Sequence, residues 1–342
     1  MIALDAHGAD GGLGVIAEGA RSSGVPVRVY GPAAAAELSG LDVADAPRVI
    51  GNDEEPVRAV RSKDDASIVR AARAVAAGEA DGLVSAGSTG AALAASVVHM
   101  KRIRGVHRPA VAVLLPVPGR DILLLDAGAN NEVRPEHLVQ FAYMGSAFME
   151  AVRGVERPKV GLLSNGEEAG KGTPDVKEAH ERLAAAAGAA PAEGSAPGTP
   201  LNFVGNVEGS DLTGGELDVV VTDGFTGNIA LKAIEGTSRT VVRAIREAVT
   251  SSPISSVGGL LIRGRVGRLR EEIDPNTVGG AILLGLRGVA VIAHGGSSAE
   301  GIANAVRLAQ RAHDERMIER TQAALEAAGV LRSAPTGSFD HQ

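Results

Sequence analysis

The sequence predicts an α/β protein built around a mostly parallel sheet. Short apolar runs, each followed by a small polar turn and a helix-period segment, recur along the 342 residues. This order is typical of strands that alternate with helices. Hydrophobic residues make up 44% of the chain, but they are mainly Ala, Val, Leu and Ile, because aromatic residues reach only 2%. Such small side chains suit close packing between helices and a sheet.

The first strand is expected in IALDAHGADGG and the second in VPVRVYGP. They resemble the start of a dinucleotide-binding unit, but the glycines do not follow G-x-G-x-x-G. The second strand also ends in Gly31 and Pro32, where an acid would be needed to hold a ribose hydroxyl. We therefore expect no use of NAD, and we expect Asp5 and Asp10 to have another role, such as a structural one.

Six further apolar runs end in glycine-rich polar turns. Loops beyond the carboxyl ends of parallel strands meet at one edge of a sheet, so we expect all six turns to line one crevice that holds the active site. The runs are Gly82 to Ser85 before AGSTG, Ile122 to Leu125 before DAGAN, Val160 to Leu163 before SNGEEAGKG, Phe203 and Val204 before GNVEGSD, Val219 to Val221 before TDGFTGN, and Val289 to Ile292 before AHGGSS.

One long helix is predicted from Pro135 to Arg153. Pro135 suits the first helical position, and apolar residues then recur every three or four positions as a core stripe. Residues 183–200 are predicted to end a helix and continue as a surface loop. Residues 1–330 are expected to form a single α/β domain, and residues 331–342 a disordered tail. The stripe consists of Leu138, Phe141, Gly145, Phe148 and Val152.

Residues 251–275 differ from the rest of the chain because they mix arginines with apolar residues, which predicts a protruding amphipathic helical segment. Two interpretations are equally weighted. The apolar side packs on the body or on a second subunit, or the segment contacts anionic lipid or an acidic protein. Its marked residues are Leu260, Leu261, Ile262, Arg263, Arg265, Val266, Arg268, Leu269 and Arg270.

Composition excludes several classes of function. The absence of Cys removes disulfides, thiolate metal sites and cysteine nucleophiles, and it fits a reducing cytoplasm. No histidine pair has metal-ligand spacing, so no metal is expected. No apolar run approaches the ~20 residues of a spanning helix, and the N-terminus does not look like a secretion signal. The net charge of -7 argues against a nucleic-acid partner but permits a local basic patch, which any acidic partner would have to meet.

The turn SNGEEAGKG places Lys171 close to Asn165, Glu167 and Glu168 after a buried strand. A lysine in such a turn suits an anionic substrate or the negative charge that develops on a carbonyl oxygen. The alternative is a surface ion pair with Glu167 or Glu168, worth ~0 to 1 kcal/mol.

Other turns offer groups for phosphate or a carbonyl oxygen. In TDGFTGN, Asp223, Thr226 and Asn228 precede or open a helix, whose free N–H groups attract anions. The alternative is a capping turn, in which Thr226 or Asn228 satisfies the first helical amides. SAGSTG could hold an anion as well, but it lacks the lysine of a P-loop and is not a nucleophile elbow. The candidates in these turns are Ser85, Ser88, Thr89, Asp126, Asn130, Asn131, His294, Ser297 and Ser298.

These turns, taken in order from Ile2 to about Ala309, resemble the phosphate acyltransferase family usually called PlsX. The stretches that carry the resemblance are LDAHGADGG, KDDASIVRAARAV, ADGLVSAGSTGA, RPAVAVLLP, LLDAGANNEVRPEHLVQFAYMGS, RPKVGLLSNGEEAGKG, NFVGNVEGSD, DVVVTDGFTGNIALKAIEG and VGGAILLGLRGVAVIAHGGSS. The resemblance implies a three-layer α/β/α sandwich, related to phosphotransacetylase and isocitrate-dehydrogenase-like folds, and a homodimer without metal or nucleotide cofactor.

The implied reaction moves a fatty acyl group from acyl carrier protein to inorganic phosphate. A glycerol-phosphate acyltransferase in the membrane would then use the acyl phosphate, and some members touch the membrane peripherally through a segment similar to residues 260–270. The resemblance points to Lys171 and Asn228 as the catalytic pair. It adds supporting contacts at Ser85, Gly87, Ser88, Asp126, Asn130, Asn165, Asp223 and His294, and membrane or carrier-protein contacts at Leu260, Leu261, Arg263, Arg265 and Arg268.

The sequence departs from the family pattern twice. His7-Gly8-Ala9-Asp10 stands where Met-Gly-Gly-Asp is usual, and Lys171-Gly172-Thr173-Pro174 where Lys-Gly-Asn-Glu is frequent. The second departure bears on the phosphate pocket around Lys171. Two rival functions remain: a phosphate acetyl- or butyryltransferase that uses coenzyme A, and a non-catalytic scaffold recruited to the membrane.

Overall fold

The computed structural model describes residues 1–117, 119–188, 201–214, 216–272 and 275–332. Its strands form one 11-stranded sheet in the order β3-β2-β1-β4-β11-β10-β5-β6-β9-β7-β8. Their bounds are β1 (Ile2–Asp5), β2 (Val27–Gly31), β3 (Asp42–Asp45), β4 (Gly82–Ser85), β5 (Ala110–Val117), β6 (Arg120–Leu125), β7 (Lys159–Leu163), β8 (Asn202–Val207), β9 (Val219–Val221), β10 (Ala281–Leu284) and β11 (Val289–Ile292).

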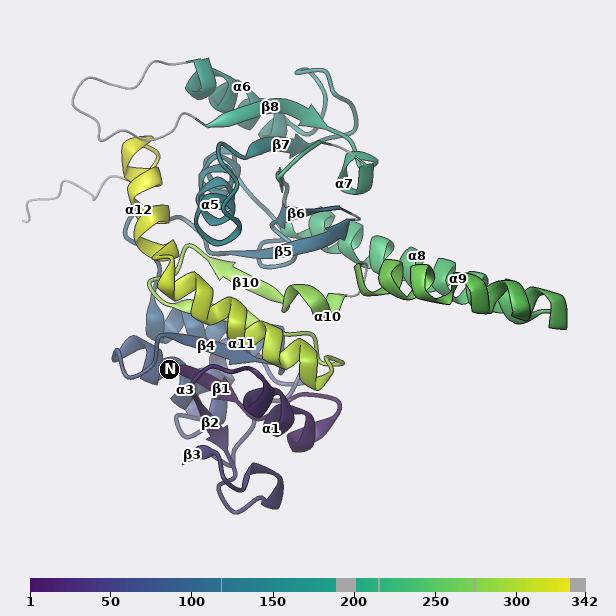
Figure 1. Ribbon diagram of the computed structural model, residues 1–342. Helices are drawn as coiled ribbons and strands as arrows, with labels where there is room; N and C mark the ends of the chain where they lie inside the picture. Colours follow the sequence, from purple (N-terminus) through teal and green to yellow (C-terminus); the bar gives the residue numbers. More distant parts are fainter. Residues whose placement is uncertain (118, 189–200, 215, 273–274, 333–342) are drawn as a thin grey trace, which may run out of the picture.

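Helices cover both faces of the sheet, which gives the predicted three-layer α/β/α sandwich (Figure 1). One face is packed by α1 (Gly12–Ser22), α5 (Pro135–Arg153), α6 (Pro174–Gly188), α11 (Ala299–Asp314) and α12 (Met317–Ala327). The other is packed by α2 (Pro56–Ser62), α3 (Ser67–Ala76), α4 (Thr89–Ala95) with its continuation η2 (Ser96–Met100), α7 (Asp211–Gly214) and the first part of α8 (Gly224–Thr250). The short elements η1 (Ala36–Leu38) and α10 (Pro275–Val278) and the long α9 (Pro253–Glu272) complete the described helices.

The sheet reverses direction in its middle. β10 is antiparallel to both β11 and β5, and β5 is antiparallel to β6, whereas the other pairs are parallel. The turns after β4 and β11 therefore lie at one edge, and those after β6, β7, β8 and β9 at the other. The prediction that all six turns share one edge is wrong, because the apolar pattern shows where a strand ends and not which way it runs.

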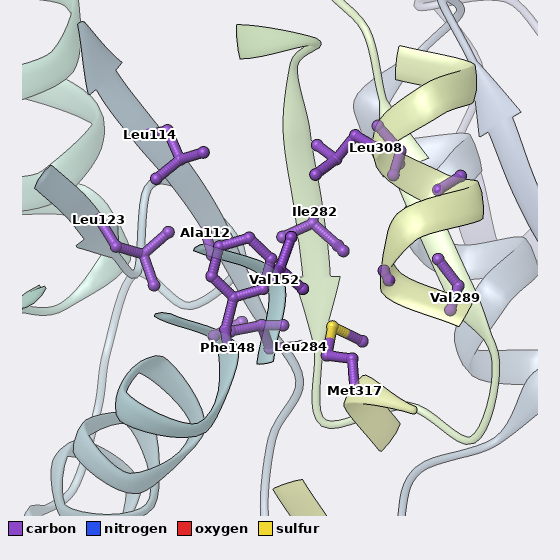
Figure 2. Packing of buried hydrophobic residues seen from close by; sticks show 14 of the residues in the cluster. Ala112, Leu114, Leu123, Phe148, Val152, Ile282, Leu284, Val289, Leu308 and Met317 are labelled. Atoms are coloured by element: carbon purple, nitrogen blue, oxygen red, sulfur yellow. The ribbon is translucent and has the colours of Figure 1, made fainter. Parts of the chain in front are cut away.

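The stripe predicted on α5 is part of the core. Phe141 and Phe148 are fully buried, and Figure 2 shows Phe148 and Val152 gathered beside Ala112 of β5 and Leu284 of β10. Burying an aromatic or branched side chain of this kind contributes about 1.5–3 kcal/mol. Gly145 belongs to the stripe for a steric reason, since a Cβ there would lie 2.6 Å from Cγ1 of Val219.

Helices α8 and α9 form a hairpin that extends away from the body (Figure 1). They approach closely at Gly259, where a Cβ would lie 2.0 Å from Val249. Large apolar side chains on the hairpin face solvent: Leu260 is 69% exposed and Leu261 82%. Arg263 and Arg265 are exposed beside them, and Arg268 lies in α9 with a side chain outside the described part. Over the residues that the structure covers, every helix is too short or too polar to cross a bilayer.

The two irregular segments predicted from the sequence lie mainly outside the described residues. Helix α6 ends at Gly188, and residues 189–200 are not described. Of the predicted tail, Leu331 and Arg332 are described: Arg332 N donates to the Gly105 carbonyl at 2.9 Å, so these two residues pack against the loop of residues 101–109.

Candidate active site

Asp126, directly after β6, is the centre of a buried hydrogen-bond network. Its Oδ1 accepts the backbone N–H groups of Val111, Gly128 and Ala129 at 2.9, 3.1 and 3.0 Å. Its Oδ2 accepts the N–H and the side-chain amide of Asn130 at 2.7 and 2.8 Å. Burial raises the pKa of Asp126, and these donors lower it in part. With its oxygens already occupied and no exposure, the carboxyl holds the DAGAN loop in place.

The start of α8 rests on this loop, and glycines make the close contact possible. Gly224 N donates to the Asn130 carbonyl at 2.7 Å. A Cβ at Gly227 would lie 1.9 Å from the Asp126 carbonyl oxygen, which no side chain allows. This packing places Asn228 over the loop, because a Cβ on Gly128 would lie 3.8 Å from the Asn228 Cβ.

Asp223 and Thr226 cap α8. Oδ1 of Asp223 accepts from Thr226 N at 2.8 Å, and its Oδ2 accepts from the Thr226 hydroxyl at 2.7 Å. The turn is therefore a capping turn, but the capping side chain is Asp223 and not the expected Thr226 or Asn228. Asn228 differs, because it is exposed and its side chain has no hydrogen bond to the described residues. Its amide is free to donate to a ligand.

Lys171 lies in the loop between β7 and α6. Asn165 shapes this loop, since its Oδ1 accepts from Gly172 N at 2.9 Å, and Lys171 N donates to the Glu168 carbonyl at 2.9 Å. The lysine stem runs across Gly166, where a Cβ would lie 2.8 Å from Lys171 Cγ. Lys171 is exposed and forms no ion pair with any described residue, so the predicted alternative pairing with Glu167 or Glu168 is absent from this part of the chain.

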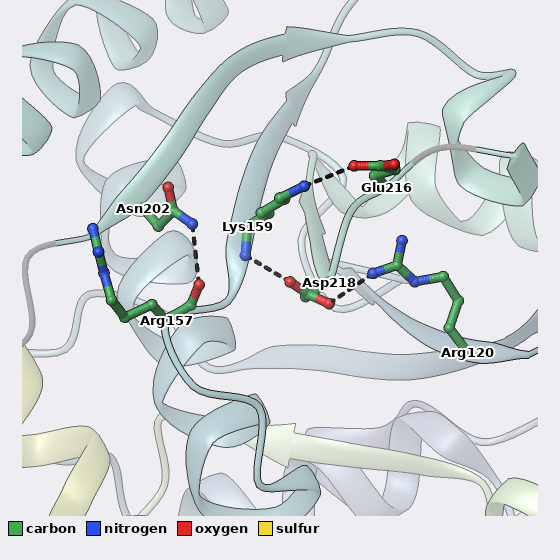
Figure 3. A network of polar contacts seen from close by, with 6 residues as sticks. All are labelled: Arg120, Arg157, Lys159, Asn202, Glu216 and Asp218. Carbon is green, nitrogen blue, oxygen red and sulfur yellow. Dashed lines mark hydrogen bonds and ion pairs between the residues drawn. The ribbon is translucent and has the colours of Figure 1, made fainter.

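The opposite ends of the same strands have their charges neutralised (Figure 3). Lys159 Nζ pairs with Glu216 at 2.9 Å, and Arg120 pairs with Asp218 at 3.2 Å. Asp218 also accepts from Lys159 N at 2.8 Å. The strands therefore have ion pairs at this end, whereas Lys171 near their other end has no ion-pair partner among the described residues. Because β6, β9 and β7 are neighbours, Asp126, Asn228 and Lys171 follow adjacent strands at one edge.

The other predicted contacts follow β4 and β11 at the opposite edge. Ser85 is buried, and its hydroxyl donates to Asp5 Oδ2 at 2.7 Å, while the Ser67 hydroxyl donates to Asp5 Oδ1 at 2.6 Å. Burial raises the pKa of Asp5. The sequence shows an acid in an otherwise apolar strand, which is the signal for such a buried carboxyl, but it does not reveal Ser67 as a partner.

Gly87, Ser88 and His294 are arranged by local bonds at this same edge. Gly87 N donates to the Ser85 hydroxyl at 3.1 Å, and Ser88 Oγ accepts from Ala91 N at 3.4 Å, capping α4. His294 Nδ1 accepts from Gly296 N at 3.0 Å. The structure thus brings these groups together with Ser85, and it does not bring them to the edge of Lys171 and Asn228.

A groove of about 1880 Å³ borders the Asp126 loop and was not predicted from the sequence. Ala129 and Asn130 line it, together with residues 101–109 and part of α4 and η2. Two of its lining residues, His107 and His137, form with Glu136 the one group in the described residues with metal-ligand geometry, whose ligand atoms lie within 4.8 Å of one another. Burial lowers the pKa of both histidines, and the positive charges of nearby arginines lower it further. Those charges oppose a bound cation, so the group fits a metal poorly.

Comparison with known proteins identifies the family. A family model described as "Fatty acid synthesis protein" matches residues 31–320. The chain shares 46% identity over 278 residues with the phosphate acyltransferase of Elusimicrobium minutum, covering 81% of this chain and 78% of the relative. The chain belongs to the phosphate acyltransferase family. The phosphate acyltransferase of Anaeromyxobacter dehalogenans strain 2CP-1 is 42% identical over 98% of this chain and 92% of its own length.

Solved structures agree with the fold of this phosphate acyltransferase family. A phosphotransacetylase from Staphylococcus aureus has a TM-score of 0.57 at 19% identity, covering 91% of this chain and 94% of its own. A 4-hydroxythreonine-4-phosphate dehydrogenase from Klebsiella pneumoniae has a TM-score of 0.52 at 16% identity, covering 92% and 99%. At these identities the likeness concerns the fold alone, and it matches the expected relation to phosphotransacetylases.

Proposed function

We propose that this phosphate acyltransferase moves a long-chain fatty acyl group from acyl carrier protein to inorganic phosphate, supplying acyl phosphate for phospholipid synthesis. The observation that carries the proposal is that Lys171 and Asn228 follow the ends of the neighbouring strands β7 and β9. Over the described residues, Lys171 forms no ion pair and the Asn228 side chain forms no hydrogen bond. Family membership adds the reaction class.

The reaction needs placement more than acid–base chemistry. A phosphate oxygen attacks the thioester carbonyl carbon, a C–O bond forms, and the carbonyl oxygen gains negative charge. The C–S bond then breaks, the oxygen charge returns to the carbonyl, and the thiolate leaves and takes a proton from water. We assign phosphate binding to the Lys171 ammonium and stabilisation of the oxyanion to the Asn228 amide.

The supporting residues act on these two through the loops. Asp126 and Asn130 hold the surface on which α8 begins, Asp223 caps α8, and Asn165 closes the Lys171 loop. The Ser85 hydroxyl donates a hydrogen bond to Asp5, so we assign no reacting group to the edge at the ends of β4 and β11.

The test measures release of free carrier-protein thiol from palmitoyl-loaded carrier, with and without phosphate. Release should depend on phosphate and fall strongly in Lys171→Ala and Asn228→Ala. Lys177→Ala, which removes another exposed lysine from helix α6, is the matched control and should keep full activity. Full release by the folded Lys171 and Asn228 variants would contradict the assigned roles.

The coenzyme A alternative predicts a different substrate profile. The phosphotransacetylase neighbours support it only through the fold. Activity with short acyl coenzyme A, together with none on palmitoyl-loaded carrier, would favour it. A scaffold without catalysis would release no thiol from either donor.

We further propose cytoplasmic homodimers that touch anionic lipid through the α8–α9 hairpin, close to the membrane glycerol-phosphate acyltransferase that uses the product. Exposed Leu260 and Leu261 beside Arg263 and Arg265 support lipid contact. Leu260→Ser with Leu261→Ser should reduce co-sedimentation with phosphatidylglycerol vesicles and leave thiol release in solution unchanged. Equal co-sedimentation would count against this contact.

A further inference from the structure

The groove beside the Asp126 loop concentrates positive charge in a protein that is acidic as a whole. Seven Arg and Lys side chains line it, against two glutamates, although the net charge of the chain is -7. Arg104 and Arg108 of the loop of residues 101–109, Arg134 and Arg332 come from three separate segments and are all exposed. A patch assembled from distant segments is a property of the fold.

The cations of the groove have no ion-pair partners among the described residues, although Arg102 donates to the carbonyls of Val106 and His107. Over the described residues, none of the seven takes part in an ion pair, whereas the chain forms eleven elsewhere. Unpaired like charges repel one another, which costs stability unless a ligand neutralises them. An anionic partner therefore gains from each of them.

The shape of the groove selects the kind of partner. It is far larger than one phosphate, at about 1880 Å³, and the partly buried apolar residues Leu93, Val97 and Val98 line it together with the cations. A lining that combines apolar and charged side chains suits a protein partner, because protein interfaces combine an apolar centre with a polar edge. No Phe, Tyr or Trp side chain is among the described residues that line the groove, and these are the usual platforms for stacked nucleic-acid bases.

The groove ends at the candidate active site. Ala129 and Asn130 line it, and the same loop supports Gly224 and Asn228 at the start of α8. We infer that this cationic groove is the docking surface for a negatively charged protein, the one that carries the thioester. The inference rests on the proposed function, and it assigns to the groove a role that the arginines of α9 were expected to share.

Charge reversal in the groove tests the inference. Arg104→Glu with Arg108→Glu changes two exposed side chains that form no ion pair with a described residue. It should raise KM for acyl-loaded carrier protein by roughly tenfold or more and remove its dependence on salt. Turnover of the same acyl group on pantetheine, which carries no charge, should stay unchanged. The matched control, Arg263→Glu with Arg265→Glu on α9, should leave both values unchanged.

Three results would overturn the inference: equal KM in the groove variant, a raised KM in the α9 variant alone, or a changed molecular mass of the groove variant in solution. The last would mean that copies of this chain meet in the groove. Calorimetric titration of unloaded carrier protein separates docking from catalysis, because binding should weaken roughly tenfold in the groove variant even if no thiol is released. If the unaltered protein binds carrier protein but releases no thiol, the proposed function is contradicted and the docking surface is not.

Discussion

The two edges of the sheet use buried carboxyls in different ways. Asp5 accepts mainly from serine hydroxyls, and its network ties up Ser85. Asp126 accepts mainly from backbone N–H groups, and its network fixes a loop while Asn228 stays free. The comparison teaches that the buried carboxyls of both edges are satisfied by hydrogen bonds, whereas Asn228, to which we assign part of the chemistry, has no side-chain hydrogen bond to a described residue.

The largest expected effect is a loss of turnover when a residue at the edge of Lys171 is replaced, compared with a residue at the edge of Ser88. Lys171→Ala should lower turnover of acyl-loaded carrier by about 10²-fold or more, the usual loss when a group that stabilises developing charge is removed. Ser88→Ala should leave turnover within about twofold and lower the free energy of unfolding by about 1 kcal/mol through loss of a cap. Thiol-release kinetics and urea unfolding measure the two. Equal losses of turnover would break the comparison.

The next effect separates the two carboxyls by stability. Asp126→Asn replaces one of the two accepting oxygens with an NH2 group. Some of the backbone N–H groups that now donate to Asp126 would then face another donor, which should lower the free energy of unfolding by about 3 kcal/mol. In Asp5→Asn the cost should be about 1 kcal/mol, because a serine hydroxyl can turn and accept. Urea unfolding at pH 7 should rank Asp126→Asn well below Asp5→Asn; the reverse order would show that the type of donor does not matter.

The smallest effect concerns pH. Burial raises the folded-state pKa of Asp5 above its unfolded value of about 3.9, so the folded protein holds this proton longer and the free energy of unfolding falls as pH rises through the folded pKa. Asp5→Asn has no such proton to lose. Its stability deficit relative to the wild type should therefore be greater at pH 4 than at pH 7. A deficit that grows with pH would mean that the pKa is lowered instead.

Local features of this fold could be predicted from the sequence. The predicted strands Gly82–Ser85, Val219–Val221 and Val289–Ile292 and the helix Pro135–Arg153 are confirmed with the same bounds, because apolar periodicity and Pro135 act within a few residues. The cap at Asp223 is also local, and TDGFTGN contains all of its atoms.

Long-range features could not be predicted. Strand direction depends on β10 and β5, which pair across about 170 residues of chain and carry no sign of their antiparallel course. Ser67 meets Asp5 from 62 positions away. Arg104, Arg134 and Arg332 share a groove only after folding. Family resemblance, and not the local pattern, points to Lys171 and Asn228 as the catalytic pair. The structure adds that, over the described residues, Lys171 forms no ion pair and the Asn228 side chain forms no hydrogen bond.

The position of β10 and β11 also governs how the chain can be made. These strands lie near the C-terminus, yet they occupy the middle of the sheet between β4 and β5. A ribosome delivers the N-terminal strands first, so β4 and β5 wait with unpaired backbone edges until about residue 290 has been synthesised. Open edges of this kind join other chains readily. A chain cut short before Ala281 should therefore aggregate during translation, and the demand for chaperones should fall on this interval.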